Sequence, residues 1–548
     1  MKTLVIAEKP SVARDIARVL GCAKKENGAL EGNQYIVTWA LGHLVTLKDP
    51  EDYDKKYKEW NMAVLPMMPE KLQIKVIPQT GKQYHAVTTQ LARKDVGEVV
   101  IATDAGREGE LVARWILDKA HNQKPCKRLW ISSVTDKAIR EGFASLKDAK
   151  EYDNLYRAAV SRAEADWLVG INATRALTCK YNAQLSCGRV QTPTLAMIAQ
   201  REQEIREFVP KPYYTVTAAA GGAVYTWKDE KSGGTRISDT EKAKQIAEKA
   251  KRYPLVLQKV EKKKKQKEAP LLYDLTELQR DASARFGYSA KQTLNLMQSL
   301  YETHKVLTYP RTDSRYLTKD IVPTLKERLD AVSIGPYKAL AQQAKRRPLK
   351  EKPGFVNDAK VSDHHAIIPT EQYVQLSALS NEERRIYDLV VRRFLAVLLP
   401  PCVYEETVIQ ASIEKECFTA RGKRMVEKGW QEAYEDNRYD DEDEAKEEVR
   451  EQNLPLLQAG MKFDQSKISL REGKTKPPAR FTEGTLLSAM ENPVRYMENR
   501  DSSLVKTIGE AGGLGTVATR ADIIEKLFRS FLLEKKGNEI YLTSKARQ

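Results

Sequence analysis

LVIAEKPSVARDIARVL, residues 4–20, decides how the N-terminal part of the chain folds. The apolar run at residues 4–7 predicts a buried strand, and Lys9-Pro10-Ser11 opens a helix whose apolar residues recur at helical spacing up to Leu20. Strand patterns follow at residues 35–40 and 99–103, and a helix pattern follows at residues 108–115. This alternation predicts an α/β domain with a largely parallel sheet over residues 1–150.

Acidic residues follow the ends of two of these predicted strands. Glu8 comes directly after the first, and Asp104 and Glu108 come after the strand at residues 99–103. The carboxyl edge of a parallel sheet is the usual ligand site, and carboxylates gathered there can hold Mg²⁺, which polarises phosphate. Lys9 and Arg107 would offset phosphate charge. Spacing alone leaves open the alternative that these acids only stabilise helix N-termini.

A second chemical pattern is VLTYPRTDS, residues 306–314. A tyrosine such as Tyr309 can attack a phosphodiester and store the bond energy in a phosphotyrosine link, so that resealing needs no ATP. Arg311 could bind that phosphate through two hydrogen bonds. Local sequence alone favours a packing role, because Tyr309 is one of 24 tyrosines. Of the histidines at 364 and 365, His364 could donate to a phosphate or serve structure alone.

Composition limits the class of protein. The 548 residues predict about three to five domains. Lysine and arginine number 91 against 75 acidic residues, and the net charge of +16 favours a polyanionic partner, although ordinary soluble proteins can also be basic. No apolar run is long enough for a membrane span or a signal peptide, so we expect a cytoplasmic protein. The six cysteines form no CxxC pair, which argues against a zinc ribbon.

The rest of the chain alternates between helical and strand-rich stretches. Residues 151–210 read as helical with an interruption at Pro193, and residues 274–400 are again helical. Strand patterns occupy residues 211–268, which include the lysine run 262–265 and a helical stretch at 238–251, and residues 403–420 and 456–470. If the strand-rich stretches share one sheet, residues 274–400 are inserted into it. The acidic segment 435–451 predicts a mobile loop.

Six motifs resemble those of the type IA DNA topoisomerases, and their order along the chain matches that family. AEKPSVARDIA and ATDAGREGE resemble a Toprim acidic site, and LTYPRTDSRYL resembles the active-site tyrosine segment. LSCGRVQTPTL, DHHAIIPT and GGLGTVATRADIIEKL resemble further family motifs. The EKPS form, the YETHK lead-in and the lack of zinc cysteines resemble the bacterial topoisomerase III branch.

This resemblance implies a multidomain fold that combines α/β, α and β parts in a four-domain toroid. Domain I would be the Toprim domain at residues 1–150. Domain IV would combine 151–212 with 471–548 and include a winged-helix-like segment at 518–542. Domain II would be a β arch formed by 213–273 and 401–470, and domain III would be the 274–400 insert that carries Tyr309.

The resemblance also implies roles for single residues. Tyr309 would attack and hold the 5′ phosphate, Arg311 and Lys9 would stabilise its charge, and His364 would support the cleaved strand. Glu8 would lie close to the leaving 3′ oxygen, as metal ligand or general acid. The Mg²⁺ ligands would be Glu8 and Asp104, with Glu108 nearby. The common DxDxE pattern has Gly106 at its second acidic position here, which removes one ligand.

The DNA-binding residues and partners implied by the resemblance complete the expectation. A single-strand groove would be lined by Trp60, Trp167, Arg175, Ser186, Cys187, Gly188, Arg189, Val190, Gln191 and Arg311, because aromatic stacking and arginine contacts suit sequence-tolerant binding. Substrates would be single-stranded, negatively supercoiled or catenated DNA in the bacterial nucleoid, and a RecQ-type helicase and a single-strand-binding protein would be partners of a monomer. Relatives of this kind would continue beyond residue 548.

Two other classes of protein compete with this interpretation. A Toprim nuclease or primase would use the acidic site without a tyrosine nucleophile, and a primase would need nucleotide-binding features that the sequence lacks. A noncatalytic single-strand DNA-binding protein would explain the charge of +16 but not the combination of Tyr309 with the acidic motifs. A covalent tyrosyl–DNA adduct separates all three.

Overall fold

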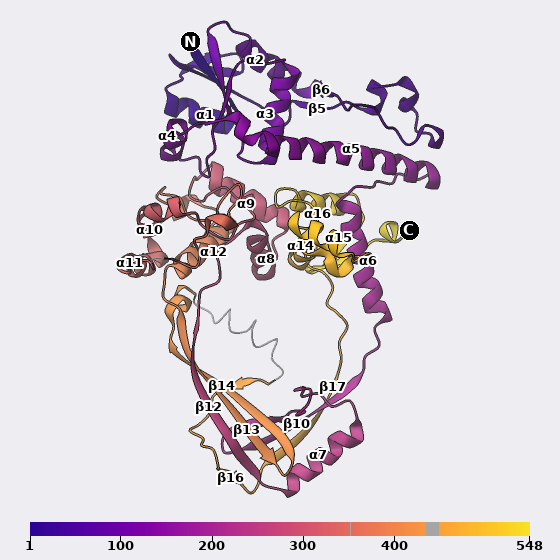
Figure 1. The fold of residues 1–548 in the computed structure, drawn as a ribbon, viewed down its shortest axis with the longest axis vertical. Helices are drawn as coiled ribbons and strands as arrows, with labels where there is room; N and C mark the ends of the chain where they lie inside the picture. Colours follow the sequence, from indigo (N-terminus) through magenta and orange to yellow (C-terminus); the bar gives the residue numbers. More distant parts are fainter. Residues whose placement is uncertain (351, 435–448) are drawn as a thin grey trace.

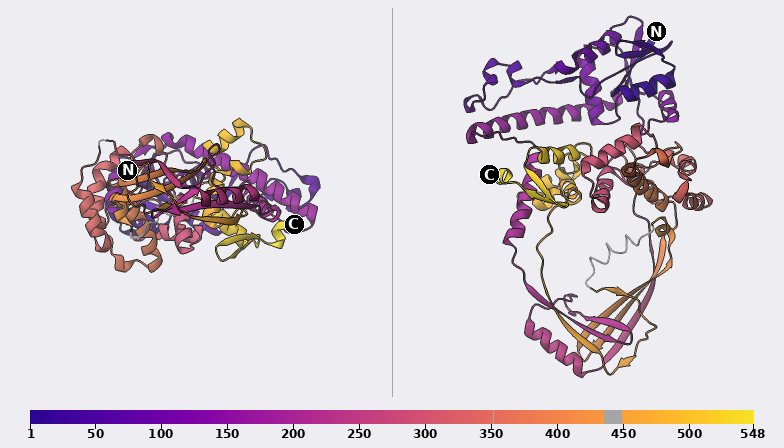
Figure 2. Two further views of the ribbon diagram at one scale, coloured as in Figure 1. Left: turned by 90° about the horizontal axis from the view of Figure 1, so that it is seen from below. Right: turned by 180° about the vertical axis from the view of Figure 1, so that it is seen from behind.

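A computed structural model describes residues 1–350, 352–434 and 449–548. Four parts are visible in Figure 1: an N-terminal α/β part, two helical parts beside each other beneath it, and a β-sheet at the opposite end. Chain segments on both sides join the helical parts to the sheet, so that the ribbon closes into a ring, and the view from behind in Figure 2 agrees. The expected ring-shaped, multidomain fold is therefore present.

The N-terminal part is built on a seven-stranded sheet with the order β2-β3-β4-β1-β7-β8-β9. Its central strand β1 pairs in parallel with β4 and β7, as the alternating pattern predicts. The strands are β1 (Lys2–Ala7), β2 (Lys24–Glu26), β3 (Ala29–Glu31), β4 (Tyr35–Trp39), β7 (Val96–Ala102), β8 (Cys126–Arg128) and β9 (Lys147–Asp148). The helices are α1 (Pro10–Leu20), α2 (Gly81–Leu91), α3 (Arg107–Lys119) and α4 (Asp136–Ala144).

Both faces of this sheet are covered, which explains why β1 reads as a continuous apolar run. Leu4 and Ile6 pack in a core with α2 and α3, whereas Val5 and Ala7 pack in a second core with α1 and α4. Tyr309, about three hundred residues away in sequence, joins that second core. Residues of the sheet therefore belong to the same apolar core as the candidate nucleophile, Tyr309.

A long extension leaves the N-terminal part and lies along helix α5 (Asp153–Tyr181). It is carried by the ribbon β5 (Val45–Leu47) and β6 (Ile74–Val76). Helix α5 packs against α3, and the next helix is α6 (Gln191–Glu207). The break between them lies at residues 182–190, so Pro193 does not interrupt a helix as predicted. It lies in the first turn of α6, where a missing backbone N–H costs nothing.

The helical part that carries Tyr309 has one large apolar core. Its helices are α8 (Leu275–Phe286), α9 (Ala290–Glu302), α10 (Leu325–Val332), α11 (Lys338–Arg346) and α12 (Asn381–Val397). Irregular segments around residues 307 and 369 cross this part and are joined by an isolated β-bridge between Leu307 and Pro369. These segments carry Tyr309 and His364 to the boundary with the N-terminal part.

The strand-rich stretches share one eight-stranded sheet, and the helical stretch between residues 267 and 402 is inserted between two of its strands. Its order is β16-β12-β13-β14-β11-β10-β17, with β15 beside β14. The strands are β10 (Pro212–Ala220), β11 (Ala223–Trp227), β12 (Leu255–Lys267), β13 (Cys402–Ile413), β14 (Glu416–Glu427), β15 (Glu451–Gln452), β16 (Lys462–Phe463) and β17 (Lys467–Lys474), and helix α7 (Thr240–Arg252) packs on β10 and β17.

The lysine run 262–265 lies on β12 opposite two acids of β13. Lys265 forms an ion pair with Glu406, which also pairs with Arg421. Cross-strand pairing of opposite charges thus accounts for part of this run. Most of the acidic segment predicted as a mobile loop, residues 435–448, lies outside the described residues.

The C-terminal part packs around α6 in a core that also includes Leu275, Ala290 and Leu294 of the inserted helical part. It consists of α14 (Glu483–Glu491), α15 (Ser502–Glu510), α16 (Arg520–Arg529), β18 (Leu533–Lys536), β19 (Glu539–Leu542) and α17 (Ser544–Arg547). Helix α16 followed by the β18–β19 ribbon agrees with the winged-helix-like pattern predicted for residues 518–542. Among the described residues, no helix combines the length and apolar character needed to cross a membrane.

Candidate active site

A cleft of about 540 Å³ lies where three parts of the chain meet. The N-terminal part contributes the loop after β7, the inserted helical part contributes the Tyr309 segment, and the C-terminal part contributes the loop between α15 and α16. Lining residues that belong to the predicted site are Glu8, Asp104, Glu108, Tyr309, Arg311 and His364. The fold therefore gathers into one cleft side chains that are up to 356 positions apart in sequence.

Tyr309 is held rigidly at the boundary between two parts. Its backbone N–H donates to the Ser132 carbonyl at 2.8 Å. Its ring packs against the ring of His364, with centroids 4.3 Å apart, and edge-on against Tyr301. The side chain is 5% exposed, and burial together with the negative charge of Asp104 raises the pKa of the phenol well above its usual value. The hydroxyl is therefore protonated at neutral pH in the absence of DNA.

Glu8 and Asp104 form a buried carboxyl pair beside Tyr309. The Asp104 backbone N–H donates to Glu8 Oε2 at 2.9 Å. Burial, and next the charge of Asp104, raise the pKa of Glu8 to about 7, and burial raises the pKa of Asp104. Two neighbouring carboxylates that are shielded from solvent repel each other unless a proton or a cation lies between them.

A carboxyl pair of this kind fits a cation that keeps most of its ligands as water and phosphate. Mg²⁺ is commonly bound through one or two carboxylates together with substrate phosphates. Glu108 is not part of the pair: it hydrogen-bonds His43 and lies 3.7 Å from Arg162. The His43 bond lowers the pKa of Glu108. In the part of the chain that the structure describes, no three His, Cys, Asp or Glu side chains are grouped as a metal site.

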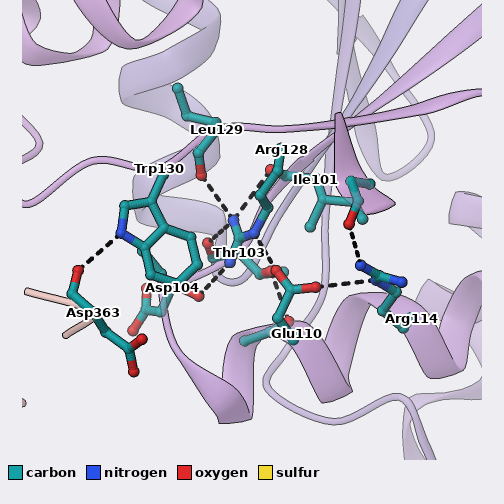
Figure 3. A network of polar contacts seen from close by, with 12 residues as sticks. Ile101, Thr103, Asp104, Glu110, Arg114, Arg128, Leu129, Trp130 and Asp363 are labelled. Atoms are coloured by element: carbon teal, nitrogen blue, oxygen red, sulfur yellow. Dashed lines mark hydrogen bonds and ion pairs between the residues drawn. The ribbon is translucent and has the colours of Figure 1, made fainter. Parts of the chain in front are cut away.

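A buried arginine fixes the loop that carries Asp104 (Figure 3). The Arg128 guanidinium is fully buried and donates to the carbonyls of Thr103 and Asp104, each at 2.7 Å. It also pairs with Glu110, which accepts from Arg114 at 3.0 Å. A charged group in this position sets the backbone path after β7 without touching the cleft. The sequence predicts no role for Arg128, because a single arginine on a short strand carries no pattern.

His364 joins the N-terminal part to the Tyr309 segment. Its Nδ1 lies 2.9 Å from Ser132 Oγ, and its Nε2 contacts the Ala105 carbonyl. The ring also stacks on Trp130, whose indole N–H donates to the Asp363 carbonyl. Burial lowers the pKa of His364 to about 3, so the ring is neutral. The neighbouring His365 contacts the Ala366 carbonyl instead, as the opposite orientation of adjacent side chains predicts.

Two known protein families match this chain. The sequence pattern of the Toprim domain matches residues 3–134, and that of DNA topoisomerase matches residues 150–548. The chain belongs to the type IA DNA topoisomerase family. It is therefore an enzyme of the isomerase class, and its Toprim domain is a metal-binding domain.

Relatives of this topoisomerase agree over its whole length. DNA topoisomerase 3 of Bacillus subtilis (strain 168) is 60% identical over 547 residues, which cover 100% of this chain and 75% of the relative. DNA topoisomerase 3 of Bacillus anthracis is 59% identical over 548 residues, with the same shares of the two chains covered. The structure of full-length topoisomerase I from Thermotoga maritima has a TM-score of 0.71 at 22% identity, covering 98% of this chain and 80% of that one, which shows a shared fold. The resemblance read from the motifs is confirmed.

The residues expected to bind DNA divide into two groups in this topoisomerase. Trp60 is 49% exposed, and the Arg175 guanidinium lies 5.1 Å from the centre of its ring. Arg175 itself is buried and donates to the Tyr57 carbonyl, and Trp167 is buried with its indole N–H on the Lys48 carbonyl. Trp167 and Arg175 therefore fasten the N-terminal extension to α5, in contrast to the expectation that they face a DNA strand.

Residues 186–191 form the turn between α5 and α6. The Cys187 backbone N–H donates to Thr174 Oγ1 at 2.9 Å, and the Gln191 amide donates to Ser186 Oγ at 3.0 Å. Arg189 pairs with Asp166 at 3.0 Å and is partly exposed. Gly188 and Val190 complete the turn, and Val190 packs against the C-terminal core. These residues share one turn that lies outside the cleft lining.

The third wall of the cleft contains residues that received no role from the sequence. Residues 510–512, 515–520 and 522 contribute to it, and the buried Arg520 donates to the Leu514 carbonyl at 2.9 Å and to the Gly512 carbonyl. Arg520 thus shapes the loop from inside. The motif GGLGTVATRADIIEKL was the available signal, because glycines beside a helix start are typical of a backbone that approaches a ligand.

Proposed function

We propose that this topoisomerase is of the topoisomerase III type and cuts one DNA strand through a 5′-phosphotyrosine link on Tyr309. It would pass a strand through the break and reseal it without ATP, relaxing negative supercoils and separating catenated DNA. The observation that supports this proposal best is the convergence of Tyr309, Arg311 and the Glu8–Asp104 pair in one cleft between separate parts of the chain.

Cleavage is a transfer between two oxygens on one phosphorus. A bond forms from Tyr309 Oη to the phosphorus while the bond to the 3′ oxygen breaks, so the number of phosphodiester bonds stays constant. The phenol proton leaves, and the 3′ oxygen gains a proton. Without a bound metal, burial and the charge of Asp104 raise the pKa of Glu8 to about 7, so a Glu8 that is not bound to Mg²⁺ is suited to donate that proton and to accept it again during resealing.

We assign the stabilisation of the phosphate charge to two cationic side chains, Arg311 and Lys9. Arg311 lines the cleft, and its buried Nε has no hydrogen-bond partner among the described residues. Lys9 follows Glu8 directly and is partly exposed. Both cations also act on the carboxyl pair by lowering the pKa of Glu8. We propose that His364, a neutral ring against Tyr309, orients the nucleophile and contacts the cleaved strand.

Mg²⁺ is the proposed metal, held by Glu8 and Asp104, and when bound it would neutralise phosphate charge and orient the DNA strand for in-line attack. Glu108 would support the site from a distance, because His43 holds its carboxylate. The single-strand groove is assigned to residues 186–191 with Trp60 and Arg311, while Trp167 and Arg175 would position the extension that carries Trp60. These assignments rest on exposure and on the family resemblance.

The domain division and the partners are proposals of the same kind. We propose domain I at 1–150, domain IV at 151–212 plus 471–548, domain II at 213–273 plus 401–470, and domain III at 274–400. The close match between these limits and the elements supports them. The enzyme would act as a monomer on nucleoid DNA in the cytoplasm, with a RecQ-type helicase and a single-strand-binding protein as partners, as its family resemblance implies.

Relaxation of a negatively supercoiled plasmid tests this proposal. Purified protein with Mg²⁺ and no ATP is expected to relax the plasmid stepwise, and Tyr309→Phe is expected to bind DNA with unchanged affinity while relaxing none. Tyr301→Phe is a matched control, because Tyr301 is equally buried beside Tyr309 but does not line the cleft. Relaxation by the Tyr309→Phe protein would contradict the proposed nucleophile.

A further inference from the structure

Lys9 is bound by a residue of the opposite part of the molecule. Its Nζ lies 3.0 Å from Oε1 of Glu302, the last residue of α9. The Glu302 side chain is 14% exposed, against 35% for Lys9. Gln298, one turn earlier on the same helix, donates to the same Oε1 and holds the carboxylate in place. This half-buried ion pair therefore joins the loop after β1 to the part that carries Tyr309.

The pair differs in place from the other charged contacts across this boundary. Lys305 pairs with Asp15 at 2.7 Å and Lys137 pairs with Glu327 at 2.6 Å, and neither pair includes a sequence neighbour of Glu8 or Asp104. Lys9 follows Glu8 directly in the sequence, so its ion pair with Glu302 ties α9 to the loop that carries Glu8. Glu302 thus contacts the residue next to Glu8, whereas the other two pairs lie farther along the boundary from it in sequence.

We infer that Glu302 is a positioning residue that holds the Lys9 ammonium ready for the scissile phosphate only while domains I and III are in contact. A lysine side chain is flexible, and fixing it in one place costs entropy that a bound partner removes in advance. An ammonium has three donors, of which Glu302 takes one, leaving two for phosphate oxygens. This inference rests on the proposed function.

The pair also makes the chemistry depend on domain contact. When domain III moves away with the 5′ phosphate on Tyr309, Glu302 moves with α9 and Lys9 loses its partner. Resealing then regains its full cationic support only after the two domains close again. In this geometry, the movement that brings the cut strand end back to the cleft also brings Glu302 back to Lys9.

The test is a double-mutant cycle on the rate of covalent adduct formation with saturating end-labelled single-stranded DNA. Glu302→Gln keeps the size of the side chain and removes its charge, and it is expected to slow adduct formation about tenfold with unchanged DNA affinity. Glu302→Asp should recover part of that loss. In the Lys9→Ala background, Glu302→Gln should cause no further loss. Glu327→Gln, which breaks the remote pair with Lys137, should leave the rate within about twofold.

Each other result counts against the inference. An equal loss in both backgrounds would mean that Glu302 acts through structure and not through Lys9, and a normal rate in Glu302→Gln would exclude a positioning role. A comparable loss in Glu327→Gln would assign the effect to domain contact in general. Failure of the wild-type protein to form any adduct would overturn the proposed function and, with it, this inference.

Discussion

A single residue, Gly106, limits the number of acidic side chains that can join the carboxyl pair of Glu8 and Asp104. In the DxDxE pattern a second aspartate would stand at position 106, where this chain has Gly106. Among the residues it describes, the structure groups no third carboxylate with this pair as a metal site: Glu108 is bonded to His43, and Glu302 is paired with Lys9. In the proposed site, metal binding would therefore depend on two carboxylates and on phosphate oxygens from DNA, so we expect the affinity for Mg²⁺ to be low until DNA is present.

Replacing Gly106 by aspartate should restore the missing ligand. The backbone of Gly106 is extended, and an added Cβ would meet no atom within 4 Å, so the substitution fits. We expect Gly106→Asp to bind Mg²⁺ roughly tenfold more tightly without DNA, because each added carboxylate raises the charge of the site. Calorimetric titration with Mg²⁺ measures this, and Gly106→Asn is the uncharged control. Equal affinities of the two variants would refute the explanation.

Burial of the Asp274 carboxyl should make the stability of the folded protein depend on pH. It is the N-cap of α8 and accepts from the Glu277 backbone N–H, and burial raises its pKa to about 7. Between the usual aspartate pKa, near 4, and pH 7, the unfolded chain loses this proton while the folded chain keeps it, so stability falls as pH rises. Asp274→Asn keeps the cap and should flatten this fall and raise the Tm at pH 8. Parallel pH profiles of Tm for both proteins would contradict this explanation.

At the scale of elements, the sequence predicted most of what lies within continuous patterns. The strands at residues 4–7, 35–40 and 99–103 appear as β1, β4 and β7, because both faces of the sheet are covered and apolar runs identify such strands. Pro193 misled the prediction, since a proline in a first helical turn looks in sequence like one that breaks a helix. Arg128 could not be predicted, because its partners are backbone carbonyls that the fold alone brings together.

The loop between α15 and α16 should depend on a glycine at position 513. An added Cβ at Gly513 would lie 2.3 Å from the carbonyl oxygens of Met490 and Glu491, and the residue has a φ of +85°. We expect Gly513→Ala to displace this wall of the cleft and to lower both the Tm and the rate of DNA cleavage. Gly512→Ala is the matched control, because it has a similar φ of +78° but open space around its Cβ.

Comparing the two alanine variants separates backbone strain from collision. If the collision displaces the loop, Gly513→Ala should lose about 1–3 kcal/mol more stability than Gly512→Ala and most of its cleavage activity. Equal effects on Tm and cleavage would show that the conformation of the loop matters and its contact with the end of α14 does not.

At the scale of the whole molecule, the order of the motifs predicted which residues meet in the cleft. It did not predict that two residues of the expected single-strand groove are buried. Tyr309 and the Glu8–Asp104 pair meet in one cleft, as expected, because the helical insert returns to the edge of the N-terminal sheet. The groove depends on which side of α5 faces the N-terminal extension. That choice buries Trp167 and Arg175, and no single helix pattern could reveal it.

The proposed cleavage through Tyr309 would need three parts of the chain together, and a covalent adduct assay measures it most directly. The protein is incubated with end-labelled single-stranded DNA and Mg²⁺, denatured, and separated on a gel. We predict a protein–DNA band that resists denaturation, that vanishes in Tyr309→Phe, and whose DNA is attached through its 5′ phosphate. Cut DNA without attached protein, or an adduct that persists in Tyr309→Phe, would contradict Tyr309 as the nucleophile.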